Sequence, residues 1–259
     1  MSKLSDAFLN GKAFIPFITC GDPSLDTTEK LVYAMEKAGA DCIELGIPFS
    51  DPTAEGPVIM AASERALKKG VTTDKIFDMV SSIREHSSIP LVFMTYANVV
   101  YSYGIERFMK KAKEVNMNGL ILPDVPFEEK EEFDQVCSQY GVDLISMVAP
   151  TSNDRIQMIA KEAKGYIYVV SSLGVTGERK EITTDIASIV KTIKEVSNVP
   201  CAVGFGISSV QTAIQMAKPS DGCIVGSAIV KLCEKYKEDC VDVVYDYVKE
   251  MKDAIVDIR

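Results

Sequence analysis

A short apolar segment followed by a helix-forming segment occurs eight times along these 259 residues, and this repeat constrains the fold more than any other feature. The apolar segments show little alternation of polar and apolar residues, as expected of strands that protein covers on both faces. Repeated units of a strand and a helix predict a parallel sheet. The expected strands are residues 13–19, 41–47, 90–96, 119–125, 143–149, 166–171, 200–206 and 222–226.

The uniformity of the chain favours a closed barrel over an open, doubly wound sheet. No linker or low-complexity tract interrupts the repeat, and about 250 residues is the usual size of a (β/α)8 barrel. We therefore predict an α/β fold, one (β/α)8 TIM barrel that forms a single domain over residues 1–259. Extra helices are expected at 2–10, closing the bottom of the barrel, and after the second and eighth strands, at 57–69, 73–86 and 227–236.

Composition and charge argue against several classes of partner and chemistry. The formal net charge of −9 disfavours nucleic acid and anionic membranes as partners, and no apolar run is long enough to span a bilayer. The seven cysteines include no CxxC pair, which is typical of reduced, buried thiols in a cytoplasmic protein. The single histidine, His86, ends a polar helical segment, so we expect neither a metal site nor histidine catalysis. Carboxylates, tyrosines and backbone groups must then carry the chemistry.

The stretch ELGIPFSDPTAEGP, residues 44–57, places carboxylates where the second expected strand ends. Function in such barrels lies at the carboxyl ends of the strands. Alternation along the strand puts Glu44 on the face shared with Cys42 and Gly46, so we expect it to point into the barrel mouth. Burial there would raise the pKa of Glu44 and suit it to proton transfer near neutral pH. Glu55 is the second candidate carboxylate.

Two glycine-rich turns predict a phosphate site. Gly206 closes the seventh strand, and Gly226 and Ser227 lie between the eighth strand and a short extra helix, which is the standard phosphate cradle of barrels of the phosphate-binding type. The alternative for either turn alone is a simple helix cap. Thr176 and Gly177 lie in the loop after the sixth strand, which is equally consistent with a lid and with an ordinary surface connection.

Aromatic and apolar residues near the strand ends predict a flat binding slot. Phe17 and Tyr168 lie at the ends of the first and sixth strands, and Ile59, Phe205 and Ile207 fit its wall, although each alone would more often be core.

Polar residues after other strands are open to a structural interpretation. Tyr96 and Asn98 follow the third strand, where packing and helix capping are as plausible as substrate binding. Asp51 and Asp124 each lie beside a proline, where an aspartate often only shapes a turn.

Seven motifs at these positions resemble the alpha subunit family of tryptophan synthase, and the resemblance covers nearly the whole chain. Because the motifs fall at the barrel positions selected above, their combination is highly specific. They are PFITCGDP (16–23), ELGIPFSDPTAEGP (44–57), TYAN (95–98), PDVP (123–126), GVTG (174–177), GFGIS (204–208) and VGSAIVK (225–231).

The resemblance implies a lyase that cleaves indole-3-glycerol phosphate to indole and glyceraldehyde 3-phosphate. It implies that Glu44 protonates the indole ring carbon and takes the proton of the glyceryl hydroxyl. It also implies that Glu55 accepts the indole N–H and stabilises positive charge on the ring. Better-known members carry aspartate at the position of Glu55, so this chain has one additional methylene there.

The resemblance also assigns binding residues. Gly177, Gly206, Gly226 and Ser227 match phosphate-binding positions, and Thr176 matches the lid residue that bonds the second carboxylate. The residues that match the substrate pocket are Phe17, Ile59, Tyr96 and Tyr168.

A partner is implied as well. The family forms a heterotetramer of two alpha and two beta subunits, in which pyridoxal phosphate belongs to the beta subunit and the alpha chain has no cofactor. Pro48, Asp51, Pro52 and Asp124 resemble the contact surface. Two alternatives stay open, which are another phosphate-binding barrel such as an isomerase, and a catalytically weak subunit that mainly activates a beta subunit.

Overall fold

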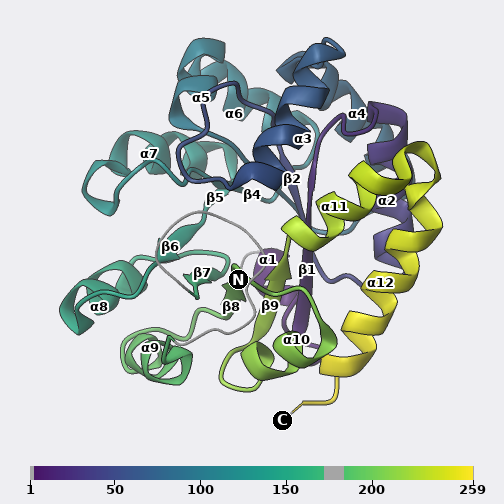
Figure 1. The fold of residues 1–259 in the computed structure, drawn as a ribbon. Coiled ribbons are helices and arrows are strands. Elements are labelled where there is room, and N and C mark those ends of the chain that lie inside the picture. Colours follow the sequence, from purple (N-terminus) through teal and green to yellow (C-terminus); the bar gives the residue numbers. More distant parts are fainter. Residues whose placement is uncertain (1–2, 172–183, 259) are drawn as a thin grey trace.

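Parallel strands form a barrel with helices around it in the computed structural model, which describes residues 3–171 and 184–258 (Figure 1). The predicted (β/α)8 barrel is confirmed. The strands are β1 (Ala13–Thr19), β2 (Ile43–Gly46), β3 (Leu91–Met94), β4 (Gly119–Ile121), β5 (Asp143–Leu144), β6 (Ser146–Val148), β7 (Ile167–Val170), β8 (Cys201–Gly204) and β9 (Gly222–Val225).

The fifth expected strand is divided, so that prediction was wrong in detail. The sheet order is β5-β4-β3-β2-β1-β9-β8-β7-β6, and every pair is parallel. β5 pairs with β4, whereas β6 pairs with β7, and Ile145 lies between them with its N–H donated to Leu120 O at 2.9 Å. Residues 143–148 therefore change partner midway and connect the two ends of the sheet.

Helices cover the outer surface of the barrel (Figure 1). Those expected after the second and eighth strands are present as α3 (Pro57–Lys68), α4 (Thr73–His86) and α11 (Ser227–Tyr236). The helices are α1 (Lys3–Asp6), α2 (Leu25–Lys37), α3 (Pro57–Lys68), α4 (Thr73–His86), α5 (Ala97–Tyr103), α6 (Ile105–Glu114), α7 (Glu131–Tyr140), α8 (Asn153–Lys161), α9 (Ile186–Lys194), α10 (Val210–Ala217), α11 (Ser227–Tyr236) and α12 (Cys240–Ile255), with 3-10 turns η1 (Phe127–Glu129) and η2 (Lys237–Asp239).

The helical segment after the third strand differs from expectation. The sequence predicts one helix there, yet α5 precedes α6, and Gly104 separates them with a φ of 91° that favours glycine. At the start of α2 the N-cap is Ser24, whose hydroxyl accepts the Thr27 N–H at 3.1 Å.

An apolar cluster fills the inside of the barrel, and α1 closes its lower end as predicted, although this helix ends at Asp6 and is shorter than the predicted segment 2–10. Leu4 belongs to this cluster and is 1% exposed. A Cβ built on Gly119 or Gly165 would lie 3.0 Å from Leu4 Cδ1, which places Leu4 beside the residues that begin β4 and precede β7. The barrel is thus closed at the amino ends of its strands, so a binding site is expected at the carboxyl ends.

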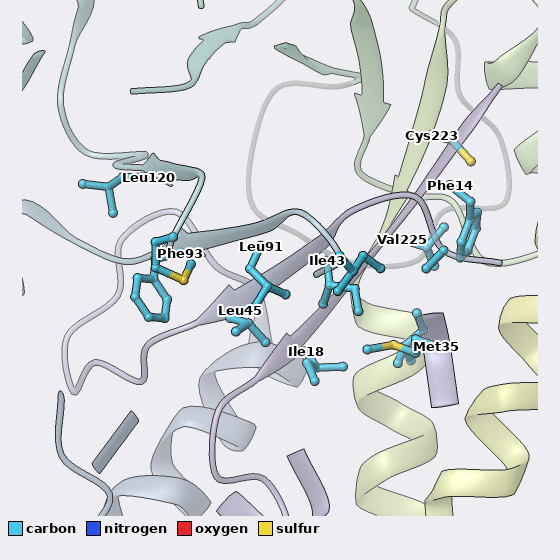
Figure 2. Packing of buried hydrophobic residues seen from close by; sticks show 14 of the residues in the cluster. Phe14, Ile18, Met35, Ile43, Leu45, Leu91, Phe93, Leu120, Cys223 and Val225 are labelled. Atoms are coloured by element: carbon cyan, nitrogen blue, oxygen red, sulfur yellow. The ribbon is translucent and has the colours of Figure 1, made fainter. Parts of the chain in front are cut away.

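A second apolar layer lies between the strands and the helices. Figure 2 shows Phe14 and Ile18 of β1 and Ile43 and Leu45 of β2 in this layer, together with Met35 of α2. Alternation along β2 therefore turns Glu44 toward the barrel interior, as the sequence predicts.

The expected burial of the thiols is also confirmed, because all seven cysteines are free and buried. None of the helices in the described ranges is long and apolar enough to cross a membrane.

Candidate active site

A pocket lies at the carboxyl ends of the strands and brings together residues from both halves of the barrel. Most of its lining was predicted from the sequence, including both candidate carboxylates. The lining residues are Phe17, Glu44, Glu55, Ile59, Met94, Tyr168, Phe205, Gly206, Ile207, Ile224, Gly226 and Ser227.

Glu44 is buried in the pocket wall with one oxygen engaged. It is 1% exposed, and its register neighbours on β1 and β3 are Phe17 and Val92. The Tyr166 hydroxyl donates to Glu44 Oε1 at 2.6 Å, whereas Oε2 has no hydrogen-bond partner among the described residues. Burial raises the pKa of Glu44 to about 8, and the Tyr166 hydrogen bond partly opposes this. A carboxyl group with such a pKa can both donate and accept a proton near neutral pH.

Glu55 enters the same pocket from the loop between β2 and α3. Burial raises the pKa of Glu55 to about 7, and a hydrogen bond with Tyr96 lowers it. The Tyr96 hydroxyl also accepts the Ala54 N–H at 3.1 Å, so it holds the loop that carries Glu55. Tyr96 is thus placed as a support of this carboxylate and is absent from the pocket lining.

Aromatic rings line the pocket that holds the two carboxylates and form the wall of the predicted slot. Phe17 fits between two glycines, because a Cβ on Gly46 would lie 2.5 Å from its Cζ and one on Gly226 would lie 3.2 Å from its Cδ1. The Tyr168 and Phe205 rings meet edge to face, with centroids 6.1 Å apart and an interplanar angle of 88°. Such a slot suits a planar apolar group.

The end of the pocket at Gly226 and Ser227 suits an anion. The first N–H groups of a helix have no partner within the helix, and the helix dipole favours negative charge there. In α10 these groups are satisfied internally, because Ser209 and Thr212 form a capping box. In α11, which Ser227 begins, no side chain within the described residues caps the N-terminus. Of the two predicted turns, the one after β9 therefore has backbone donors available for a phosphate.

The residues expected at a partner surface lie in different environments. Asp51 is exposed and Pro52 is partly exposed, but Pro48 is buried. Asp124 is exposed, and both its carboxylate oxygens lie 3.1 Å from the Ala97 N–H, which they cap at the start of α5. The Asp124 carboxylate therefore connects two loops and does more than shape its own turn. Thr176 and Gly177 lie outside the described residues.

Tyr166 was not predicted from the sequence, nor were Met94 and Ile224 in the pocket lining. Tyr166 lies two residues before Tyr168, so period-two alternation puts both side chains inside the barrel, with Tyr166 one layer deeper. That alternation was the available signal for Tyr166. Within the described ranges, no cluster of three or more histidine, cysteine, aspartate or glutamate side chains is arranged to hold a metal ion.

Comparison with known proteins gives a consistent result. The family model described as "Tryptophan synthase alpha chain" matches residues 5–256. A tryptophan synthase alpha chain from Lacticaseibacillus casei is 47% identical over 255 residues, which cover 98% of this chain and 96% of the relative. The crystal structure of the alpha chain from Legionella pneumophila has 34% identity and a TM-score of 0.88, covering 100% of this chain and 98% of that chain.

A structure of the tryptophan synthase a2b2 complex from Pyrococcus furiosus, solved to explain mutual activation, also matches. The identity is 32% and the TM-score 0.86, with 94% of this chain and 99% of that chain covered.

Proposed function

The chain belongs to the tryptophan synthase alpha chain family, and on that premise we propose that Glu44 and Glu55 carry the family's reaction in this molecule. The activity is the retro-aldol cleavage of indole-3-glycerol phosphate to indole and D-glyceraldehyde 3-phosphate, which makes the protein a carbon–carbon lyase. The observation that carries the assignment is the presence of two carboxyl groups with raised pKa values in one pocket, one buried and one partly buried, next to an uncapped helix N-terminus.

Glu44 moves the proton. With a pKa of about 8 it is mostly protonated at neutral pH and can donate to the indole ring carbon that carries the glyceryl chain. Protonation turns the ring into an electron acceptor. The glyceryl hydroxyl then returns its proton to the Glu44 carboxylate, the carbon–carbon bond breaks, and its electron pair restores the aromatic indole. The glyceryl carbon becomes the aldehyde of glyceraldehyde 3-phosphate.

Glu55 stabilises the charge that develops on the ring. Protonation of the ring carbon places positive charge on the indole nitrogen, and a carboxylate that accepts the N–H lowers the energy of this state. Burial raises the pKa of Glu55 only to about 7, so a large fraction is ionised at neutral pH. At a given pH, Glu55 is therefore ionised to a greater extent than Glu44, which suits Glu44 to the acid role and Glu55 to the anion role.

The rest of the pocket binds the two ends of the substrate. Phe17, Ile59, Tyr168 and Phe205 wall the slot for the indole ring, and Tyr96 holds the Glu55 loop. The backbone donors at Gly226 and Ser227 receive the phosphate, and Gly206, which lines the same pocket, belongs to the phosphate site through the matching motif. Thr176 and Gly177, which lie outside the described residues, belong to the proposed site through the matching motif.

The partner is the beta subunit of tryptophan synthase, in a heterotetramer of two alpha and two beta subunits. Indole passes to that subunit, where pyridoxal phosphate supports the synthesis of L-tryptophan, and this chain needs no cofactor. We propose that the face around Asp51, Pro52 and Asp124, with Pro48 beneath it, contacts the beta subunit. The proposal also includes a single domain over residues 1–259, because β1 pairs with β9 across the chain, and a cytoplasmic location, which the free thiols fit.

Indole release from indole-3-glycerol phosphate by the purified chain, with and without a beta subunit, tests this function. We expect equal amounts of indole and glyceraldehyde 3-phosphate, and faster release in the complex. Conversion of a sugar phosphate without indole release would support the isomerase alternative. Activation of the beta subunit without cleavage would support the activator alternative.

A further inference from the structure

Arg65 of α3 joins three separate parts of the barrel. Its Nε donates to Asp22 Oδ1 at 2.9 Å and its Nη2 donates to Asp22 Oδ2 at 2.8 Å, so the guanidinium binds this carboxylate with two parallel bonds. Its Nη1 donates to Glu234 Oε1 on α11 at 2.8 Å. Asp22, in the loop after β1, is 3% exposed and therefore needs a partner. Lys69 adds a bond of 2.6 Å to Pro23 O in the same loop.

The two helices that Arg65 connects carry the two ends of the pocket. The acid arm, defined as Glu55 with the first turn of α3, includes Ile59. The phosphate arm, defined as Gly226 with α11, presents the uncapped N-terminus. α3 and α11 pack against each other and against β1 (Figure 1). At 1.5 Å per residue, the bond between Arg65 and Glu234 lies roughly 10 Å along each helix from the pocket.

Only a guanidinium can make these contacts together. Its five donors form a rigid fork that can hold one carboxylate with two bonds and a second carboxylate with another, whereas a lysine ammonium is a point charge on a flexible stem. Since α3 and α11 are stiff, their orientation at this bond determines the separation of their pocket ends. Indole-3-glycerol phosphate must contact both arms at once.

We propose that Arg65 is a positioning residue that sets the spacing between the acid arm and the phosphate arm. The inference rests on the proposed function, because spacing matters only for a substrate that reaches both arms. Loss of Arg65 should therefore reduce binding and cleavage of the whole substrate more than it reduces binding of either half of the substrate. Each half of the substrate contacts only one arm, and each arm remains intact when Arg65 is replaced.

The test compares Arg65→Lys and Glu234→Ala with the wild type and with Lys68→Ala. Lys68 is a matched control on the same helix, because its exposed ion pair with Glu64 joins no other element. Steady-state assays give kcat and KM for indole-3-glycerol phosphate. Calorimetry gives Kd for glycerol 3-phosphate and for indole, the two halves of the substrate, and circular dichroism checks that each variant is folded.

We expect Arg65→Lys to lower kcat/KM about tenfold or more, because small misplacements of reacting groups are costly. Glu234→Ala should have a smaller effect in the same direction, and it preserves the pair with buried Asp22, so it should fold normally. Kd for each half should stay nearly unchanged in both variants, and Lys68→Ala should resemble the wild type.

Wild-type kcat/KM in Arg65→Lys and Glu234→Ala would overturn the inference. A loss of affinity for glycerol 3-phosphate as large as the loss of kcat/KM would also overturn it, since it would show damage to the phosphate arm itself. Failure of the wild-type protein to release any indole would instead refute the proposed function, and the inference with it.

Discussion

Tyr166 donates a hydrogen bond of 2.6 Å to Glu44 Oε1 and leaves Glu44 Oε2 without a partner in the described part of the chain. The two oxygens of one carboxyl group therefore have different roles. The bond to Tyr166 fixes the orientation of the side chain, and the second oxygen is available to the substrate. The same bond opposes the effect of burial on the pKa of Glu44, which is about 8.

Replacement of Glu44 by glutamine should abolish indole release while the fold persists. Glutamine has nearly the same shape, and its carbonyl oxygen can still accept from Tyr166, but it cannot transfer a proton. We expect the rate to fall by a factor of about 100 to 10,000, the usual contribution of general acid–base catalysis. An indole assay with circular dichroism at neutral pH checks both points, and near-normal activity in Glu44→Gln would contradict the assignment.

Removal of the Tyr166 hydroxyl should shift the pH dependence of cleavage. The hydrogen bond favours the charged form of Glu44, so its loss in Tyr166→Phe should raise the pKa of Glu44 above the present value of about 8. Because Glu44 acts first as an acid, activity should decline at high pH, and this decline should move to higher pH in the variant. The measurement is the profile of log(kcat/KM) from pH 6 to pH 10.

The matched control for this shift is Tyr236→Phe, which removes a hydroxyl from an exposed tyrosine outside the pocket. Its profile should overlay that of the wild type. A Tyr166→Phe profile with an unchanged or lower alkaline limit would show that the bond does not control the proton transfer.

Variants that shorten or neutralise Glu55 should separate the effect of its charge on activity from the effect of its length. Glu55→Gln loses the carboxylate that stabilises the ring cation, and we expect roughly a hundredfold loss in kcat, as for other electrostatic groups in active sites. Glu55→Asp keeps the charge and loses one methylene, so it should retain more activity than Glu55→Gln. Side-by-side values of kcat decide the matter, and a glutamine variant more active than the aspartate variant would rule out a charge role.

Much of this architecture could be predicted because it depends on local patterns. Alternation within β2 already turns Glu44 inward, and the glycines at 206 and 226 indicate the anion end before any tertiary contact is known. The same alternation places Tyr166, one residue before β7, on the inner face of the barrel. The carboxylate that its hydroxyl contacts, however, lies 122 positions away in the sequence. Spacing within one strand cannot show which carboxylate that hydroxyl will meet.

Other features depend on tertiary contacts that a single segment does not encode. The change of partner at Ile145 follows from closing the barrel between β4 and β7, and nothing in residues 143–149 marks it. The start of α5 is capped by Asp124, a residue that follows the next strand. Asp124 looks like a turn residue in sequence, whereas in the structure it connects two loops.

The two aspartates of the proposed partner face should behave differently when replaced. Asp51 is exposed, so Asp51→Ala should weaken binding of the beta subunit and leave the free energy of unfolding nearly unchanged. Asp124→Ala removes the cap of α5 and should also cost about 1 kcal/mol of stability. Titration with beta subunit and urea unfolding measure the two quantities.

Asp253→Ala, on α12 and away from α5 in Figure 1, is the control for both variants. Unaltered binding of the beta subunit by Asp51→Ala and Asp124→Ala would place the contact surface elsewhere.

Burial of Glu44 should make the protein less stable at high pH, and Glu44→Gln should remove this dependence. The pKa of Glu44 is raised from 4.5 to about 8 in the folded protein, so between these values the folded state binds the proton that the unfolded state releases. The resulting stabilisation is complete below pH 4.5 and is lost as pH rises through about 8. Each unit of pKa shift corresponds to about 1.4 kcal/mol, so the total amounts to a few kcal/mol.

Urea unfolding of wild type and Glu44→Gln at pH 6 and pH 9 measures this contribution. The wild type should lose more stability than the variant between these two values, because glutamine has no proton to release. The difference isolates Glu44 from other groups that titrate in this range, including Glu55, since they are present in both proteins. Equal losses in the two proteins would mean that Glu44 is already ionised in the folded state at pH 6, which would also remove it as the acid of the cleavage reaction.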